Sequence, residues 1–171
     1  MNLGPHHRHA FQFGYVTSDL AAAQAQIARL YGVGAWVSFP VDREVIYRGQ
    51  PARFTIDVAL ANFGDRQIEL IVPHGGSRDF YLDGIDLDRQ LMHFHHIAML
   101  VVGPESEWHT LKRELADAGR PFTLYSDEDT IINFGYLDTR AEWGHYTEYH
   151  WRHPEGEASF REMAEASVRP A

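Results

Sequence analysis

The segment HHIAMLVV at residues 95–102 is dominated by apolar and β-branched side chains, and it predicts a β-strand. The turn residues Gly103 and Pro104 follow it, and residues 107–118 have the composition of a helix that ends at Gly119. A strand followed directly by a helix is the beginning of a structural unit. The same beginning occurs once more in the chain.

The other copy starts with FQFGYVT at residues 11–17, which is aromatic and β-branched enough to form a strand. Ser18 and Asp19 are favourable N-cap residues, and the helical segment after them runs to Tyr31 and is stopped by Gly32. The first half of the chain therefore begins with the same strand and helix as the second half.

The two opening strands align with each other. With Gln12 placed over His96, FGYV lies over IAML at an offset of 84 residues, and each strand is followed by a helix that ends in Gly. Such a repeat indicates the duplication of one unit. Further strands are predicted at 36–39, 44–48, 53–61 and 67–72, and again at 122–125, 130–137 and 146–151. We expect two modules, the first at 10–73 and the second at 95–152, joined by an acidic solvated linker at 74–94. A flexible arm at 1–9 should precede them, and a C-terminal tail or short helix at 153–171 should follow.

The composition limits the chemistry that a site in this chain can use. The 171 residues include 11 histidines and no cysteine, so disulfides, thiol nucleophiles and cysteine-bound metals are excluded. A metal must be held by imidazole, carboxylate, amide or water. The net charge of -9 argues against a nucleic-acid partner. No apolar run reaches the roughly 18 residues of a membrane span, and we expect a cytoplasmic protein with no membrane partner.

Strand parity places unusual pairs of residues on one face of each opening strand. Gln12 and Gly14 share a face in the first, and His96 and Ala98 share a face in the second. In both pairs a polar side chain stands beside a very small residue, which leaves space for a site. His95 falls on the opposite face by the same parity, which favours a core role or a role behind the site.

The last predicted strand of each half carries a carboxylate among apolar residues. Glu69 lies within QIELIVP, and Glu148 lies within GHYTEYHW. A carboxylate is costly to bury unless it is paired or bound to a metal. Each half therefore offers a polar residue on its first strand and a carboxylate on its last, 57 residues apart in one half and 52 in the other.

These motifs resemble the vicinal oxygen chelate superfamily, which includes glyoxalase I, methylmalonyl-CoA epimerase, extradiol dioxygenases and bleomycin-resistance proteins. The resemblance covers residues 10–151 and is carried by QFGYVTSDL, GDRQIEL, HHIAMLVV, INFGYLDT and GHYTEY. It implies an α+β fold of two tandem βαβββ modules, whose curved, cleft-enclosing mixed β-sheet has its helices outside. It also implies four metal ligands, one from each of four strands: Gln12, Glu69, His96 and Glu148.

The branch of the superfamily is less clear from these residues. A Gln, Glu, His, Glu set is similar to that of some glyoxalase I enzymes, whereas HHIA and the GHYTEY ending are similar to methylmalonyl-CoA epimerase. In the epimerases we expect His in place of Gln12 and Gln in place of Glu69. The substrate thus stays open between a coenzyme A thioester, a glutathione adduct and another carbonyl compound.

One imidazole, two carboxylates and an amide oxygen suit a single divalent ion such as Zn, Ni, Co or Mn, with open positions for substrate oxygens. Such a site suits a metal-dependent isomerase, epimerase or lyase that moves a proton next to a carbonyl or thioester through a metal-stabilised enediolate. We expect Glu148 as the catalytic base and Glu69 as its counterpart on the opposite side.

Two alternatives remain from the sequence. One is a metal-free protein that binds small molecules, as drug-sequestering relatives do. The other is a ring-cleaving dioxygenase, which is disfavoured because the predicted ligand set lacks the second histidine of the usual iron triad. A coenzyme A or glutathione substrate would need a cationic patch, which Arg43, Arg48 and Arg53 or Lys112, Arg113 and Arg120 could supply, but the same side chains are as easily explained as solubilising surface groups. His93, His145, His150 and His153 are expected at the surface or lining the pocket. Open sheet edges also favour a homodimer.

Overall fold

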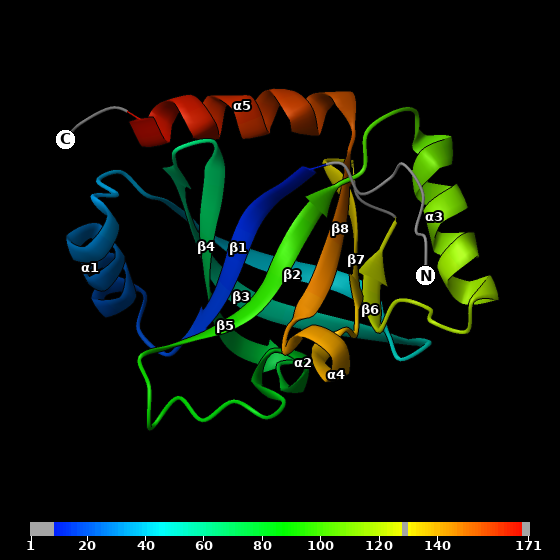
Figure 1. The fold of residues 1–171 in the computed structure, drawn as a ribbon, viewed down its shortest axis with the longest axis horizontal. Coiled ribbons are helices and arrows are strands. Elements are labelled where there is room, and N and C mark those ends of the chain that lie inside the picture. Colours follow the sequence, from blue (N-terminus) through cyan, green and yellow to red (C-terminus); the bar gives the residue numbers. More distant parts are fainter. Residues whose placement is uncertain (1–8, 128–129, 169–171) are drawn as a thin grey trace.

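A computed structural model describes residues 9–127 and 130–168, with side chains as far as residue 162. Eight strands of the described chain form a closed barrel in the order β1-β4-β3-β2-β6-β7-β8-β5 (Figure 1). The strands are β1 (His9–Thr17), β2 (Val37–Tyr47), β3 (Gln50–Phe63), β4 (Arg66–Gly76), β5 (Met92–Leu100), β6 (Leu124–Ser126), β7 (Ile132–Leu137) and β8 (Tyr146–Arg152). The helices are α1 (Leu20–Tyr31), α2 (Asp79–Leu82), α3 (Glu105–Asp117), α4 (Arg140–Trp143) and α5 (Pro154–Val168). Apart from His9, the expected N-terminal arm lies outside the described residues.

The barrel consists of two copies of one unit, β1-α1-β2-β3-β4 and β5-α3-β6-β7-β8. In each copy the first strand is parallel to the last, as β1 is to β4 and β5 is to β8. The copies are joined by antiparallel pairing of β1 with β5 and of β2 with β6. The structure confirms the predicted α+β fold, with two βαβββ modules and helices outside the sheet.

The two strands predicted at 36–39 and 44–48 form one continuous strand, β2. Pro40 between them pairs with Asp57 in the β2–β3 register without ending the strand. Over most of its length β2 has a partner on one side, because it pairs with β6 only through Ile46 and Tyr47. An edge position tolerates a proline because the missing N–H group is not needed by a second neighbour.

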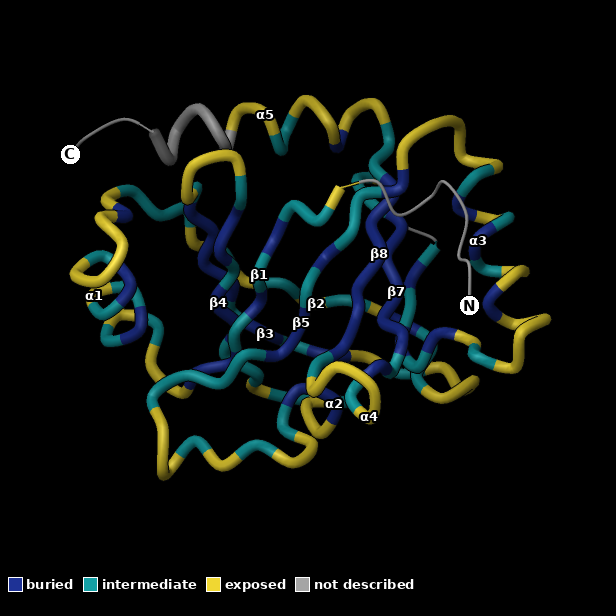
Figure 2. The backbone as a smooth tube through the Cα atoms, viewed as in Figure 1, coloured by how far each residue is buried: buried dark blue, intermediate teal, exposed yellow. Residues whose placement is uncertain are grey.

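The long helices α1 and α3 lie outside the barrel at opposite sides, with their buried positions turned toward the strands (Figures 1 and 2). α1 begins with Asp19, whose carboxylate accepts a hydrogen bond from the Ala22 backbone N–H at 3.0 Å. It buries Ala23 and Ile27 against β3 and β4. The corresponding helix α3 packs on β8 and β7 through its apolar side chains Trp108, Leu111 and Leu115.

The segment between the modules does more than connect them. We expected a solvated linker there, but α2 places Phe80 and Tyr81 in the apolar interior of the barrel, each 1% exposed. Phe80 contacts the rings of Tyr136 and Tyr146 at centroid distances of 4.9 and 4.8 Å. The aromatic pair thus fills one end of the barrel, while the charged residues around it face solvent.

The C-terminal helix α5 crosses the other end of the barrel and contacts β2, β3 and β8 (Figure 1). Arg152 anchors it, because its guanidinium lies 4.8 Å from the ring centroid of Phe11 and 4.1 Å from that of Phe160. Arg152 also forms an ion pair with Glu157 at 3.3 Å. Gly156 brings the helix against the backbone of Ile131, where a Cβ atom would lie 1.9 Å from the carbonyl oxygen.

Two sequence expectations concern the surroundings of the molecule. Within the described residues, no helix has the length and apolar character needed to cross a membrane.

The homodimer was expected from open sheet edges, yet the barrel closes within one chain through the pairs Ile46 with Tyr125 and Tyr47 with Leu124. The homodimer stays a prediction, with less support from edge pairing than the sequence suggested.

The packing of α3 predicts a specific loss of stability. Replacement of Leu115, which is 0% exposed, by alanine leaves a cavity between α3 and the barrel and should lower the free energy of unfolding by about 2–5 kcal/mol. Leu30 on α1 is 58% exposed, and its replacement by alanine should cost less than about 0.5 kcal/mol. Urea denaturation measures both values, and equal losses in the two variants would contradict this packing.

Candidate metal centre

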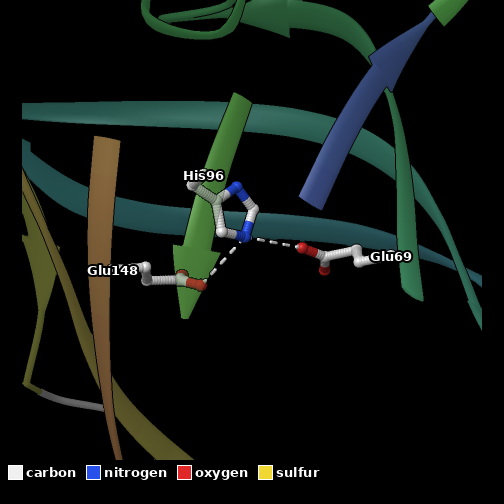
Figure 3. A group of neighbouring side chains, drawn as sticks. All are labelled: Glu69, His96 and Glu148. Carbon is white, nitrogen blue, oxygen red and sulfur yellow. Dashed lines mark ion pairs between the residues drawn. The ribbon is translucent and has the colours of Figure 1, made fainter. Parts of the chain in front are cut away.

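Three predicted ligands converge at the centre of the barrel, each from a different strand. Glu69 comes from β4, His96 from β5 and Glu148 from β8, and the two carboxylates approach the imidazole from opposite sides (Figure 3). His96 Nε2 lies 3.2 Å from Glu69 Oε2 and 3.2 Å from Glu148 Oε2. The three ligand atoms all lie within 4.8 Å of one another, so one cation could contact all of them.

Gly14 on β1 makes room for this cluster. In the register of the sheet it lies opposite Glu69 on one side and opposite His96 on the other. A Cβ atom at position 14 would lie 1.9 Å from Cε1 of His96, so the imidazole occupies the space that a side chain would need. The space that the parity pattern predicted beside Gln12 is therefore filled by the histidine of the neighbouring strand.

The burial and geometry of the cluster fit a bound cation. The His96 side chain is 0% exposed, that of Glu148 is 3% exposed and that of Glu69 is 15% exposed. Nε2 of His96 and Oε2 of Glu148 have no hydrogen-bond partner among the described residues, although they are 3.2 Å apart. Atoms that are close but not aligned for hydrogen bonding are arranged as donors to a common point, which is what a metal requires.

The electrostatics of the cluster lead to the same interpretation. Burial opposes protonation of the His96 ring, but the charge of Glu148 and contacts with both carboxylates outweigh it and raise the pKa of His96 to about 9. Burial also opposes ionisation of Glu148, yet His150 and His96 hold the pKa of this carboxyl well below its usual range. A proton and a divalent ion would therefore compete for the same ring nitrogen.

The fourth predicted ligand, Gln12, lines the same cavity as Glu69 and Glu148. Its amide Nε2 donates a hydrogen bond to Oε1 of Gln67 at 2.7 Å, which holds the side chain in place. Its carbonyl oxygen Oε1 is buried and has no hydrogen-bond partner among the described residues. Gln12 thus presents an available oxygen donor, while its role as a ligand stays a prediction.

His95 departs from the parity rule. The β1–β5 register moves from the pair Gly14 and His96 to the pair Tyr15 and Phe94, which leaves His95 as the extra residue of a β-bulge. The bulge turns His95 toward the interior, where its Nδ1 lies 3.1 Å from Nδ1 of His96. The predicted opposite face is therefore wrong, whereas the predicted role behind the site agrees with this contact.

Two tyrosines that the sequence did not place there lie beside the cluster, together with His150, which was expected at the surface or lining the pocket. Tyr81 and Tyr136 are buried, and burial and then the charge of Glu148 raise the pKa of both phenols well above 10. Both phenols stay protonated near neutral pH and can donate hydrogen bonds. Nε2 of His150 lies 3.0 Å from Oε2 of Glu148. Its spacing of two residues from Glu148 was a usable signal, because such residues share a face of a strand.

A cavity of about 460 Å³ opens onto the cluster and is bordered by Gln12, Glu69, Glu148 and His150. Its volume is within the range of small-molecule sites. Most of its remaining wall is apolar, and α5 contributes Ser159 and Phe160. Glu69 and Glu148 therefore border a space inside the barrel that is large enough for a small molecule, while His96 lies buried behind them.

With this geometry, the sequence can be compared with known families. The sequence profile of the Glyoxalase/Bleomycin resistance protein/Dioxygenase superfamily matches residues 11–131. The chain belongs to this superfamily. The resemblance to vicinal oxygen chelate proteins is thereby confirmed, and the barrel of two βαβββ modules is the fold expected for a member.

Solved structures share this fold at low sequence identity. A methylmalonyl-CoA epimerase from Mycobacterium tuberculosis is 17% identical, with a TM-score of 0.51 over 86% of this chain and 90% of that one. A hypothetical protein from Bacillus halodurans C-125 is 13% identical, with a TM-score of 0.51 over 84% of this chain and 94% of that one. At these identities the likeness shows the fold. No curated protein matches the sequence.

The contact between Gly14 and His96 predicts that position 14 controls metal binding. In Gly14→Ala the methyl group displaces the imidazole, and the affinity for a divalent ion should fall by about 10-fold to 100-fold. A Cβ atom at position 34 would have no other atom within 4 Å, so Gly34→Ala is the matched control and should bind the ion with normal affinity. Isothermal titration with Zn²⁺ or Ni²⁺ measures both, and unchanged affinity in Gly14→Ala would contradict the assigned contact.

Proposed function

We propose that this protein is a divalent-metal-dependent isomerase, epimerase or lyase that moves a proton on the carbon next to a carbonyl or thioester group. The observation that carries the proposal is the pair of carboxylates on either side of the buried His96, at the end of a cavity large enough for a substrate. The likeness in fold to a methylmalonyl-CoA epimerase gives additional support to proton transfer at such a carbon.

Glu69, His96 and Glu148 would hold the ion, and Gln12 would supply an amide oxygen. When bound, a divalent ion polarises the carbonyl and stabilises the negative charge that develops on its oxygen as the proton leaves. This stabilisation is necessary because a carboxylate with an ordinary pKa near ~4.3 is too weak a base for an unassisted carbon acid. Zn, Ni, Co and Mn all suit these donors.

The two carboxylates lie on different sides of the cluster, so one can remove a proton from the substrate and the other can return a proton to it. Glu148 belongs to the second module and Glu69 to the first, and Figure 3 shows them across His96 from each other. In our proposal Glu148 removes the α-proton, and Glu69 serves the opposite face of the substrate. Removal on one side and return on the other inverts the carbon, whereas return by the same group at another atom isomerises the substrate.

Neighbouring side chains would support this step. His150 contacts Glu148 Oε2 at 3.0 Å and so orients the carboxylate that acts as the base. Tyr81 and Tyr136 remain protonated and donate hydrogen bonds where negative charge develops. The apolar wall of the cavity keeps water away from the reacting carbon.

A metal-free binding protein is the second candidate, and the largely apolar cavity favours it. Against it, the convergence of His96 with two carboxylates has no use in a protein that only sequesters apolar molecules. The dioxygenase alternative gains no support, because the convergent group among the described residues contains one histidine rather than two.

Metal content tests the first part of the proposal. Protein prepared without chelators or affinity tags that bind metal should contain a single divalent ion per chain, and His96→Ala should lose it because the central ligand is gone. His74, which pairs with Asp57 outside the cluster, is the matched control, and His74→Ala should keep the ion. Elemental analysis by mass spectrometry gives the ratio of metal to protein, and equal metal content in both variants would contradict metal binding at His96.

Proton exchange tests the catalytic role of Glu148. Candidate substrates, including methylmalonyl-CoA and the glutathione adduct of a 2-oxoaldehyde, should acquire solvent deuterium at the α-carbon in D₂O. Glu148→Gln should slow this exchange by about 100-fold or more, because the amide cannot accept the proton. The control Glu142→Gln removes a carboxylate that is 47% exposed and should leave the rate unchanged. Exchange followed by NMR that is equally fast in Glu148→Gln would exclude this residue as the base.

A further inference from the structure

The imidazole of His96 has two ring nitrogens, and each of them has a different partner. The dashed lines in Figure 3 meet at Nε2, which faces Glu69 and Glu148, while Nδ1 points away from both carboxylates. Nδ1 lies instead 3.1 Å from Nδ1 of His95. The central residue of the cluster is thus joined to the residue before it in the chain, through the nitrogen that the carboxylates do not contact.

The β-bulge in β5 makes this contact possible. Consecutive residues of a regular strand point to opposite faces, so the side chains of His95 and His96 would lie on opposite sides of the sheet. The register shift between Gly14 and Tyr15 on β1 leaves His95 as the extra residue and turns it to the interior, where both imidazoles are buried. The bulge therefore brings two neighbours in the sequence into contact.

The surroundings of His95 hold its ring in one orientation. The side chain is 3% exposed. Its ring contacts four aromatic rings at centroid distances between 4.9 and 5.9 Å, those of Phe80, Tyr81, Tyr136 and Tyr146. Side chains packed this closely have little room to rotate, so Nδ1 of His95 stays directed at His96.

A hydrogen bond between the two Nδ1 atoms contains a single proton, because one nitrogen must accept if the other donates. If His95 donated this proton, a neutral His96 would carry its own proton on Nε2. Nε2 could not then bind a cation, because a metal ligand needs its lone pair. If His96 donates the proton, the lone pair of its Nε2 remains directed at the space between the two carboxylates.

The groups around the two rings favour His96 as the donor. Both carboxylates lie 3.2 Å from its Nε2, and they stabilise positive charge on this ring, whether a proton or an ion supplies it. A ring with positive charge at Nε2 is the stronger donor through Nδ1. The aromatic rings packed on His95 favour an uncharged imidazole, which can accept.

We propose that His95 is a positioning residue of the metal centre, whose Nδ1 accepts the Nδ1 proton of His96 and so keeps Nε2 of His96 available to a divalent ion. The inference rests on the metal site of the proposed function and adds the group that fixes the tautomer of its central ligand. Metal-bound histidines commonly donate their second N–H to a carboxylate, a carbonyl or water. A neutral imidazole in this place orients His96 without adding a third negative charge to the two carboxylates.

The hydrogen bond can be measured in the unaltered protein. In protein with ¹⁵N-labelled histidine, an N–H···N hydrogen bond produces a scalar coupling between its two nitrogens, and the ring chemical shifts show which nitrogen carries the proton. We expect a coupling between the Nδ1 atoms of His95 and His96, with the proton on His96, in both the Zn²⁺-loaded and the metal-free protein. A proton on Nδ1 of His95, or the absence of the coupling from either form, would overturn the proposal.

Two replacements at position 95 separate the acceptor from the ring. His95→Asn keeps an acceptor oxygen near the place of Nδ1, whereas His95→Phe keeps a ring and has no acceptor. In isothermal titration with Zn²⁺, His95→Phe should bind about 10-fold to 100-fold more weakly than the wild type, and His95→Asn should recover part of this loss. His74→Phe is the control and should keep the wild-type affinity, because His74 is half exposed and pairs with Asp57 outside the cluster.

A role of His95 in packing alone predicts the opposite order, because phenylalanine fills the aromatic surroundings and asparagine leaves a cavity. Tighter binding of Zn²⁺ by His95→Phe than by His95→Asn, or unchanged affinity in His95→Phe, would therefore contradict the proposal. If a variant does not fold, as judged by thermal unfolding, the coupling in the wild type decides. Wild-type protein that binds no divalent ion would contradict the proposed function and this role together, whereas metal binding without the coupling would contradict this role alone.

Discussion

The antiparallel pairing of β1 with β5 is the constraint on which the site depends. It joins the two modules and places Gly14 beside both Glu69 and His96, so that the imidazole crosses a position without a side chain. Neighbouring strands lie about 4.8 Å apart, and Glu148 follows on β8 at the other side of β5. Residues far apart in the sequence therefore meet around His96, Glu148 from the adjacent strand β8 and Glu69 from β4 on the far side of β1, and a shift of one residue in this register would separate them.

The sequence contained enough information to predict the two modules and three residues of the cluster. A period of two is a property of the strand itself, and a repeat applies the same rule to both halves. Glu69 and Glu148 were recognisable because a carboxylate within an apolar strand needs a partner. Gln12 was predicted by the same symmetry, and its amide does border the cavity, but its Nε2 is held by Gln67, which no local pattern identifies.

The features that escaped prediction depend on contacts between distant segments. The bulge at His95 exists only relative to β1, so the isolated β5 sequence gives the wrong face. Phe80 and Tyr81 lie among acidic and glycine residues that suggest a loop, and their burial follows from the open end of the barrel that they fill. The position of α5 depends likewise on the cation and aromatic contacts of Arg152, which join three separate parts of the chain.

The apolar wall and the charged cluster have a common physical basis. In a region of low polarity, the attraction between a cation and two carboxylates is stronger than in water, but so is the cost of leaving any of these charges uncompensated. A protonated His96 compensates only one of the two carboxylates, whereas a dication compensates both. Burial of the cluster therefore favours a divalent ion over a proton as the charge that the two carboxylates share.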